Sequence, residues 1–319
     1  MIQPKFSWPL TQADIQSILA TSSIRKRRFL GNDNPFNQES VELFLDLPGG
    51  VQLHGYYTKS SGPDLAILLH GWEGSAQSSY ILATANQLYK KGVSVFRLQF
   101  RDHGDTHHLN EEIFHSCRIQ EVVDAVAKIN KLYQPRNLFL AGFSLGGNFA
   151  LRVALHSEKA DIPLKHVVAV SPAIDPKKSL AAIESALPIY RWYFLKKWKN
   201  SLLIKSTHFP DKYSFGKNLK NRSLLDLTKV LVENYTDFNL VDDYFDGYSV
   251  AGDRLKSLSV STHIITAEDD PVIPVDDFYK LELPDNVKLT ITPHGGHCGF
   301  ISNLSLRGWV EEQISREFT

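Results

Sequence analysis

Apolar and polar residues follow two different patterns along the chain, and the two patterns alternate. Short apolar runs that fit strands are followed by longer stretches with apolar residues at helical spacing. The runs that predict strands are 40–57 (two strands around a Pro-Gly-Gly turn), 65–71, 93–100, 137–143, 166–173, 262–270 and 287–297 with its loop. The stretches that predict helices are 78–92 with Gly92 as its C-cap, 118–133, 147–157 and 305–318.

Strands that alternate with helices at this spacing predict an α/β fold, with a mostly parallel central sheet and helices on both faces. The alternation stops between residues of about 175 and 255, where the chain is rich in aromatics and lysines and has a helical pattern. We interpret this stretch as a helical cap inserted between two strands of a single domain, residues 1–319. It is expected to cover the carboxyl edge of the sheet, where open α/β sheets bind ligands.

Composition narrows the choice of partner and compartment. Lys+Arg and Asp+Glu both total 35, so no basic excess predicts a nucleic-acid partner. Cys117 and Cys298 form no disulfide framework and fit a reducing compartment. The segment 1–16 lacks the apolar centre of a signal peptide, and no apolar run reaches the roughly 18 residues that span a bilayer. The expected location is therefore the cytoplasm.

The first candidate for chemistry is Ser144, in the sequence GFSLGG over 142–147. This sequence fits the G-x-S-x-G nucleophile elbow, and it lies between a predicted strand and a predicted helix. A tight turn at this point crowds the backbone, and Gly142 and Gly146 relieve the crowding. The turn would raise the hydroxyl above the sheet and aim the first amides of the helix at the same point. The alternative is a turn serine without a catalytic role.

A nucleophilic serine needs a base and an acid. His297 follows two glycines on the loop after the last strand and is expected to reach back over the sheet, whereas His294 lies nearer the strand end and is expected at the surface. The acidic turn after residue 267 contains Asp269 and Asp270, and we prefer Asp270 because it stands four residues before Pro274. The order serine, acid, histidine is that of an α/β-hydrolase triad.

The oxyanion formed during such a reaction needs two backbone N–H donors. Leu145, directly after the serine, is expected to supply one. The loop after the strand 65–71 contains the sequence HGWEGS, in which His70 and Gly71 shape the turn and Trp72 would donate its amide. Any tight turn can contain a His-Gly pair, so this assignment depends on the elbow.

The histidine-rich stretch 100–116 is a second cluster of polar residues. It contains four histidines and two aspartates, namely His103, His107, His108, His115, Asp102 and Asp105. Their spacing matches no standard zinc motif. We therefore interpret the stretch as a structural loop that shapes the pocket, and we assign neither a metal nor an organic cofactor.

Several segments taken together resemble the AB-hydrolase 4 family, which includes bacterial YheT-type hydrolases. These segments are LLHGWEGSAQSSYILATANQLYKKGVSVFRLQFRDHG, IFHS, GFSLGGN, DDPVIP, GGHCGF and, near the N-terminus, ADIQSILATSSIRKRRF. The resemblance implies a serine carboxylesterase-like fold and a triad of Ser144, Asp270 and His297. The chain departs from the family at Trp72, where an aliphatic residue is commoner, and at Asp102-His103-Gly104.

The predicted function is hydrolysis of a short acyl or lipid ester through an acyl-enzyme. A thioesterase or acyltransferase would use the same triad, and a non-catalytic hydrolase-like binding protein is the alternative outside enzymes. The aromatic and lysine-rich stretch 189–200 is expected to cover the active site; the other interpretation is peripheral contact with a membrane surface. Oligomeric state is not predicted.

Overall fold

A computed structural model describes residues 6, 8–30, 38–215, 219, 223–303 and 305–319. Residues 1–5 and 7 of the N-terminal segment considered for a signal peptide, and six positions of the predicted insertion, lie outside these ranges. Within them, eight strands form one sheet: β1 (Ser40–Asp46), β2 (Gln52–Thr58), β3 (Leu65–Leu69), β4 (Ser94–Gln99), β5 (Leu138–Phe143), β6 (Leu164–Val170), β7 (Thr262–Ala267) and β8 (Val287–Thr292).

The strand order is β1-β2-β4-β3-β5-β6-β7-β8. Neighbours from β4 to β8 pair in parallel, and β2 pairs antiparallel with both β1 and β4, so β2 alone runs in the opposite direction. This arrangement confirms the predicted mostly parallel sheet. Because the strands β3 to β7 lie side by side, their carboxyl ends meet at one edge of the sheet.

The central strands are apolar on both faces because helices cover both faces. In β3, Ile67 and Leu69 belong to the core under α5 (Ile119–Tyr133) and α6 (Leu145–His156). Ala66 and Leu68 face the opposite core, under α4 (Ser79–Lys90) and α11 (Trp309–Glu317). Each large aliphatic side chain buried in this way contributes about 1.5–3 kcal/mol to folding.

Several predicted boundaries move by two to four residues, and three of those at the carboxyl edge of the sheet bear on the site. The helix α6 begins at Leu145 rather than 147, β6 ends at Val170 rather than 173, and β7 ends at Ala267 rather than 270. Ser144 and Ser171 have φ values of 54° and 42°, and this left-handed backbone ends the strands before them. Because β7 already ends at Ala267, Asp270 lies in a loop rather than in a strand.

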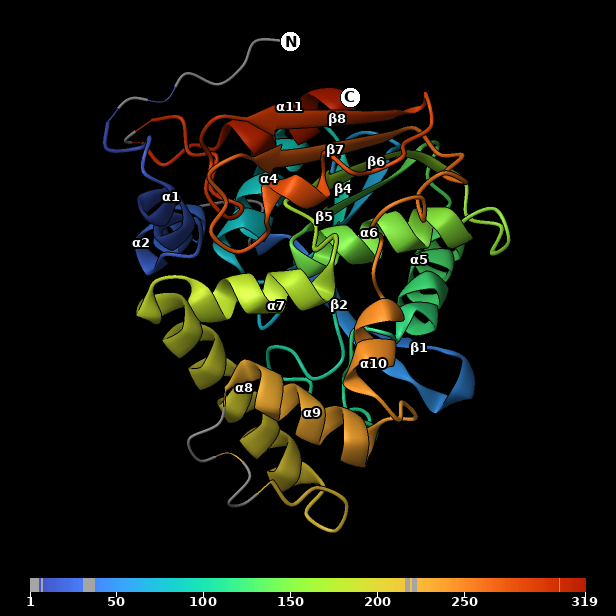
Figure 1. Ribbon diagram of the computed structural model, residues 1–319. Helices are drawn as coiled ribbons and strands as arrows, with labels where there is room; N and C mark the ends of the chain where they lie inside the picture. The colour runs from blue at the N-terminus through green and yellow to red at the C-terminus, as the bar shows by residue number, and fades with distance from the viewer. Residues whose placement is uncertain (1–5, 7, 31–37, 216–218, 220–222, 304) are drawn as a thin grey trace.

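Between β6 and β7 the described residues form four α-helices: α7 (Pro176–Ser185), α8 (Pro188–His208), α9 (Leu224–Tyr235) and α10 (Val241–Asp246). They lie on the side of the sheet onto which the carboxyl ends of the strands open (Figure 1). Two of them, α7 and α9, begin with a side-chain cap. Asp175 caps α7 by accepting the Lys178 N–H, and Ser223 forms a capping box with Asp226 at α9.

Two N-terminal helices, α1 (Ala13–Ala20) and α2 (Ser23–Leu30), pack beside α4 at the edge of the molecule (Figure 1). The pattern of apolar and polar residues did not predict these two helices. A buried salt bridge between Arg25 and Glu311 ties α2 to α11, and Arg25 Nε also donates to the Leu306 carbonyl. Among the described helices, none has the length and apolar character needed to cross a membrane.

Candidate active site

Ser144 occupies the sharp turn between β5 and α6. Its backbone is left-handed, with φ 54° and ψ −120°. A Cβ on Gly142 would come within 2.0 Å of the Gly146 carbonyl oxygen, and one on Gly146 would lie 2.4 Å from the carbonyl oxygens of Leu69 and His70. Only glycine fits at either position, so the turn of the nucleophile elbow has the crowding that its sequence predicts.

The structure brings Ser144, His297 and Asp270 into one hydrogen-bonded chain across 153 and 27 residues of sequence. The Ser144 hydroxyl lies 2.9 Å from His297 Nε2, and His297 Nδ1 lies 2.9 Å from Asp270 Oδ2. The carboxylate of Asp270 has no solvent exposure. Burial lowers the pKa of His297, but the Asp270 charge raises it, and the net pKa lies well above its ordinary value.

Asp269 and His294 form a separate pair beside this chain. The Asp269 carboxylate accepts the Gly296 N–H at 2.8 Å and lies 3.3 Å from His294 Nδ1. The His294 side chain is 42% exposed, in keeping with its expected surface position. Asp269 therefore holds the backbone of the histidine loop, whereas Asp270 contacts the imidazole of His297.

The two expected oxyanion donors lie on either side of Ser144. Leu145 is the first residue of α6, so its N–H has no acceptor within the helix. The Gly71–Trp72 peptide is oriented by His70, whose Nδ1 donates to the Gly71 carbonyl at 2.8 Å while Nε2 accepts the Phe100 N–H at 3.2 Å. In a trans peptide the N–H points away from the C=O, so this bond also fixes the direction of the Trp72 N–H.

His70 orients the Gly71–Trp72 peptide as a neutral imidazole. Its side chain is fully buried, and burial lowers its pKa to about 4. A neutral ring has one donor and one acceptor nitrogen, which matches its two hydrogen bonds. The loop is held further by Tyr80, whose hydroxyl oxygen accepts the Gly71 N–H at 3.0 Å.

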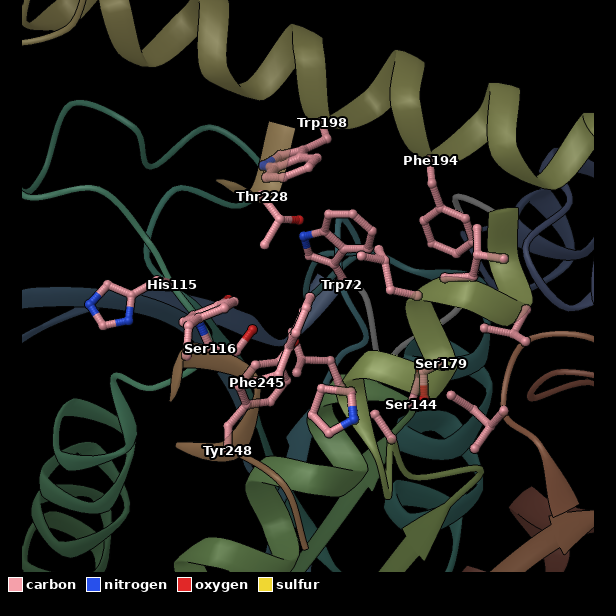
Figure 2. A pocket seen from close by; sticks show the side chains of 18 of the residues that line it. Trp72, His115, Ser116, Ser144, Ser179, Phe194, Trp198, Thr228, Phe245 and Tyr248 are labelled. Carbon is pink, nitrogen blue, oxygen red and sulfur yellow. The ribbon is translucent and has the colours of Figure 1, made fainter. Parts of the chain in front are cut away.

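Helix α8 also contacts the loop that is expected to supply this oxyanion donor. The Trp72 indole stacks on Phe194 with ring centroids 5.4 Å apart and meets Trp198 edge-on at 5.1 Å. Lys197 Nζ donates to the Glu73 carbonyl oxygen at 2.9 Å. Figure 2 shows Phe194 and Trp198 reaching from α8 toward Trp72, with Ser144 on the opposite side of the cavity.

The N-terminal helix α1 supports the histidine loop through residues that the sequence patterns had not marked. Ser17 Oγ accepts the His297 N–H at 2.8 Å. Gln16 binds both backbone groups of Ile301, donating to its carbonyl at 3.0 Å and accepting its N–H at 2.8 Å. These contacts join positions 280 and 285 residues apart, so no local signal in the sequence could have revealed them.

Two cavities meet at Ser144, and both are lined by Trp72 and Phe194. The first is an apolar pocket of ≈ 100 Å³ between the sheet and helices α7 to α10 (Figure 2). The second is a groove of ≈ 900 Å³ between α8 and the N-terminal helices α1 and α2, and it reaches His297. Ser144 thus faces an apolar pocket on one side and a wider groove on the other.

The histidine-rich loop packs against α8 through a buried ion pair. Lys205 Nζ lies 2.9 Å from Asp102 Oδ1 and donates to the Asn110 carbonyl at 2.5 Å. Phe114 donates its N–H to the other Asp102 oxygen at 2.7 Å, and its side chain lines the apolar pocket. Within the described residues, no group of three or more His, Cys, Asp or Glu side chains has the arrangement of a metal site.

Comparison with known proteins identifies the family. Residues 66–304 match the Alpha/beta hydrolase family. The "Putative esterase YheT" of Escherichia coli is 27% identical, over 78% of this chain and 74% of that protein. Phospholipase ABHD3 of Mus musculus is 24% identical, over 78% of this chain and 61% of that protein.

Among solved structures, the esterase Pf2001 of Pyrococcus furiosus is 17% identical and has a TM-score of 0.57, over 99% of this chain and 97% of that one. This likeness shows a common fold. The two sequence relatives confirm the predicted resemblance to the AB-hydrolase 4 family. Since the family match extends over well more than half of its residues, this chain belongs to the alpha/beta hydrolase family.

Proposed function

We propose that this protein hydrolyses carboxylic esters, with Ser144 as nucleophile, His297 as general base and Asp270 as the acid that orients the histidine. The observation that supports this proposal is the chain of two 2.9 Å hydrogen bonds from the Ser144 hydroxyl through His297 to the buried Asp270 carboxylate. The sequence relatives, named an esterase and a phospholipase, belong to the same class of ester hydrolases.

In the first half of the reaction, Ser144 Oγ attacks the ester carbonyl carbon while His297 Nε2 takes its proton. Asp270 stabilises the imidazolium that forms. The carbonyl oxygen becomes an oxyanion, which the N–H groups of Leu145 and Trp72 stabilise. The tetrahedral intermediate then collapses, the bond to the alcohol breaks, and His297 returns the proton to the departing oxygen.

In the second half, a water molecule attacks the acyl-enzyme. His297 takes a proton from this water as it adds to the acyl carbon. The second tetrahedral intermediate releases the carboxylic acid, and Ser144 Oγ recovers its proton from His297. The open groove reaches His297 and supplies a route for the water.

The two cavities suggest how the ester is divided. The apolar pocket is lined by Phe194, Trp198, Leu231 and Ile183, so it suits the acyl chain. Its volume of ≈ 100 Å³ is small, which favours a short chain. The groove of ≈ 900 Å³ would then receive the alcohol, which can be considerably larger.

The test is hydrolysis of p-nitrophenyl esters of increasing chain length by the wild type and by Ser144→Ala. Loss of the nucleophile is expected to lower kcat by several powers of ten, about 10⁴ or more. Ser185→Ala removes an exposed serine whose hydroxyl only bonds the α7 backbone, and it serves as the matched control. The wild type and this control should react with a fluorophosphonate, whereas Ser144→Ala should not.

Wild-type rates in Ser144→Ala would overturn the assignment of the nucleophile. No hydrolysis and no fluorophosphonate labelling of the wild type would indicate a binding protein. A rate that falls as the acyl chain lengthens would support the proposed use of the small apolar pocket.

A further inference from the structure

Large hydrophobic side chains are exposed around the mouth of the open groove. Ile24 on α2 is 67% exposed and Trp192 on α8 is 58% exposed, and Ile18 and Ile189 are each about half exposed. All four line the groove that reaches Ser144. Together with two lysines of the same lining they form what we call the groove rim, which consists of Ile18, Ile24, Lys26, Ile189, Trp192 and Lys196.

The helix α8 has two apolar faces rather than one. Phe194 and Trp198 point inward to the cavity at Ser144. Trp192 and Lys196, spaced four residues apart, lie on the exposed side, and the Lys196 ammonium sits 4.7 Å from the centre of the Trp192 ring. Covering the active site uses only the inward face, so it does not account for an exposed tryptophan on the other side.

The exposed charge of the groove rim is positive. The sequence of α8 over 188–208 contains no Asp or Glu but five Lys or Arg residues. Two carboxyl groups line the groove: Asp102 is paired with buried Lys205, and burial raises the pKa of Glu73 to about 8, which keeps it largely neutral at pH 7. Asp14 on α1, which is not among the residues that line the groove, accepts a hydrogen bond from the Tyr190 hydroxyl at 2.8 Å.

The N-terminal side of the groove rim is fixed in place by a buried anchor. Arg25 lies between Ile24 and Lys26 in sequence and is completely buried in its salt bridge with Glu311 of α11. Because neighbours in a helix point in different directions, burial of Arg25 turns Ile24 outward. The apolar and basic side chains of α2 are therefore held beside those of α8.

We propose that the groove rim docks on a lipid bilayer that contains anionic lipid, so that the groove leading to Ser144 opens toward the lipid surface. Tryptophan and aliphatic side chains enter the boundary between headgroups and acyl chains, and the surrounding lysines bind the anionic headgroups. A protein partner of matching shape would have to be acidic as well as apolar. The anionic bilayer supplies both properties at once.

Docking is tested by co-sedimentation of the full chain with vesicles of phosphatidylcholine, with and without phosphatidylglycerol. The Ser144→Ala variant is used alongside the wild type, so that binding is measured without turnover. The wild type and Ser144→Ala are expected to bind alike, and to prefer the anionic vesicles. Raised salt should weaken this binding because it screens the lysines.

Three variants separate the groove rim from other exposed apolar residues. Trp192→Ser and Lys196→Glu should each lower the partition coefficient on anionic vesicles by about tenfold or more. Leu132→Ser is the matched control, since Leu132 is 56% exposed on α5, on the other side of the molecule (Figure 1). It should bind like the wild type, and thermal unfolding would show that each variant is folded.

Several results would overturn the proposal. One is an absence of binding to anionic vesicles, and another is a loss of vesicle binding in Leu132→Ser that equals the loss in Trp192→Ser. A third is a change of oligomeric state in Trp192→Ser without any vesicle binding, because the groove rim would then be an interface between copies of this chain. Failure of the proposed ester hydrolysis would instead leave vesicle binding intact, because binding is read out with Ser144→Ala.

Discussion

Replacement of Asp270 by Asn tests the least obvious member of the proposed triad. Asp270 Oδ1 accepts the N–H groups of Val272 at 2.8 Å and Ile273 at 3.0 Å, while Oδ2 faces His297 Nδ1. In Asp270→Asn the two backbone donors still need an acceptor, so they retain the amide oxygen at the Oδ1 position. The amide NH₂ is thereby forced to face His297.

This orientation predicts the size of the effect. An NH₂ group donates to Nδ1, so the imidazole proton must move to Nε2, and Nε2 can then no longer accept the proton of Ser144. When an Asn enforces this wrong tautomer, kcat falls by about 10⁴ in a serine protease of known mechanism. The same loss here corresponds to about 5.5 kcal/mol of transition-state stabilisation.

The assay is p-nitrophenyl ester hydrolysis, with Asp269→Asn as the matched control. The oxygen of the substituted side chain can still accept the Gly296 N–H, and the bond to partly exposed His294 is already long at 3.3 Å. Its kcat should therefore stay within about tenfold of the wild type, about 1.4 kcal/mol. If Asp269→Asn lost more activity than Asp270→Asn, with both variants folded, the assignment of the acid would be wrong.

Two further predictions concern charged groups of the same structure. The pKa of His297 is raised because the Asp270 charge outweighs burial, and the base must be neutral to act, so kcat/KM should fall as the pH drops through this raised pKa. In Asp270→Asn the acid limb of the pH profile should move to lower pH. A limb that stays in place would contradict the coupling between Asp270 and His297. Lys205→Met leaves the buried Asp102 charge without its partner and should lower the free energy of unfolding by about 3–5 kcal/mol. Lys212→Met, which breaks a partly exposed pair, should cost about 0–1 kcal/mol in the same denaturant titration.

The parts of the fold that follow local patterns were predictable from the sequence. The apolar runs identify the parallel strands because strands covered by helices on both faces are mostly apolar, even though β4 also buries Arg97 and Gln99. The elbow at Ser144 was predictable for a related reason, since only glycine fits at positions 142 and 146. The strand ends were less predictable because left-handed residues such as Ser171 end them, and serine gives no signal for that conformation.

Residues that support the site through distant contacts could not be predicted. Ser17 and Gln16 hold the histidine loop from a helix 280 residues earlier, and Lys205 binds a carboxylate 103 residues away. The chemistry of a triad restricts which residue types can serve, so Ser144 and His297 stand out in a sequence. A hydrogen bond to a backbone N–H can come from many side chains, so Ser17 does not.

The loop at Gly71–Trp72, which is proposed to supply one oxyanion donor, contacts both the sheet and helix α8. Its peptide at Gly71–Trp72 is held from the sheet by His70, but the Trp72 ring is held from the cap by Phe194 and Trp198. The helix α8 that supplies both of these rings also carries half of the groove rim, namely Ile189, Trp192 and Lys196. A rigid shift of α8 would therefore move the aromatic support of Trp72, one proposed oxyanion donor, while leaving the other, Leu145, in place on α6. Of the two proposed donors, only Trp72 thus belongs to a residue whose side chain packs against α8.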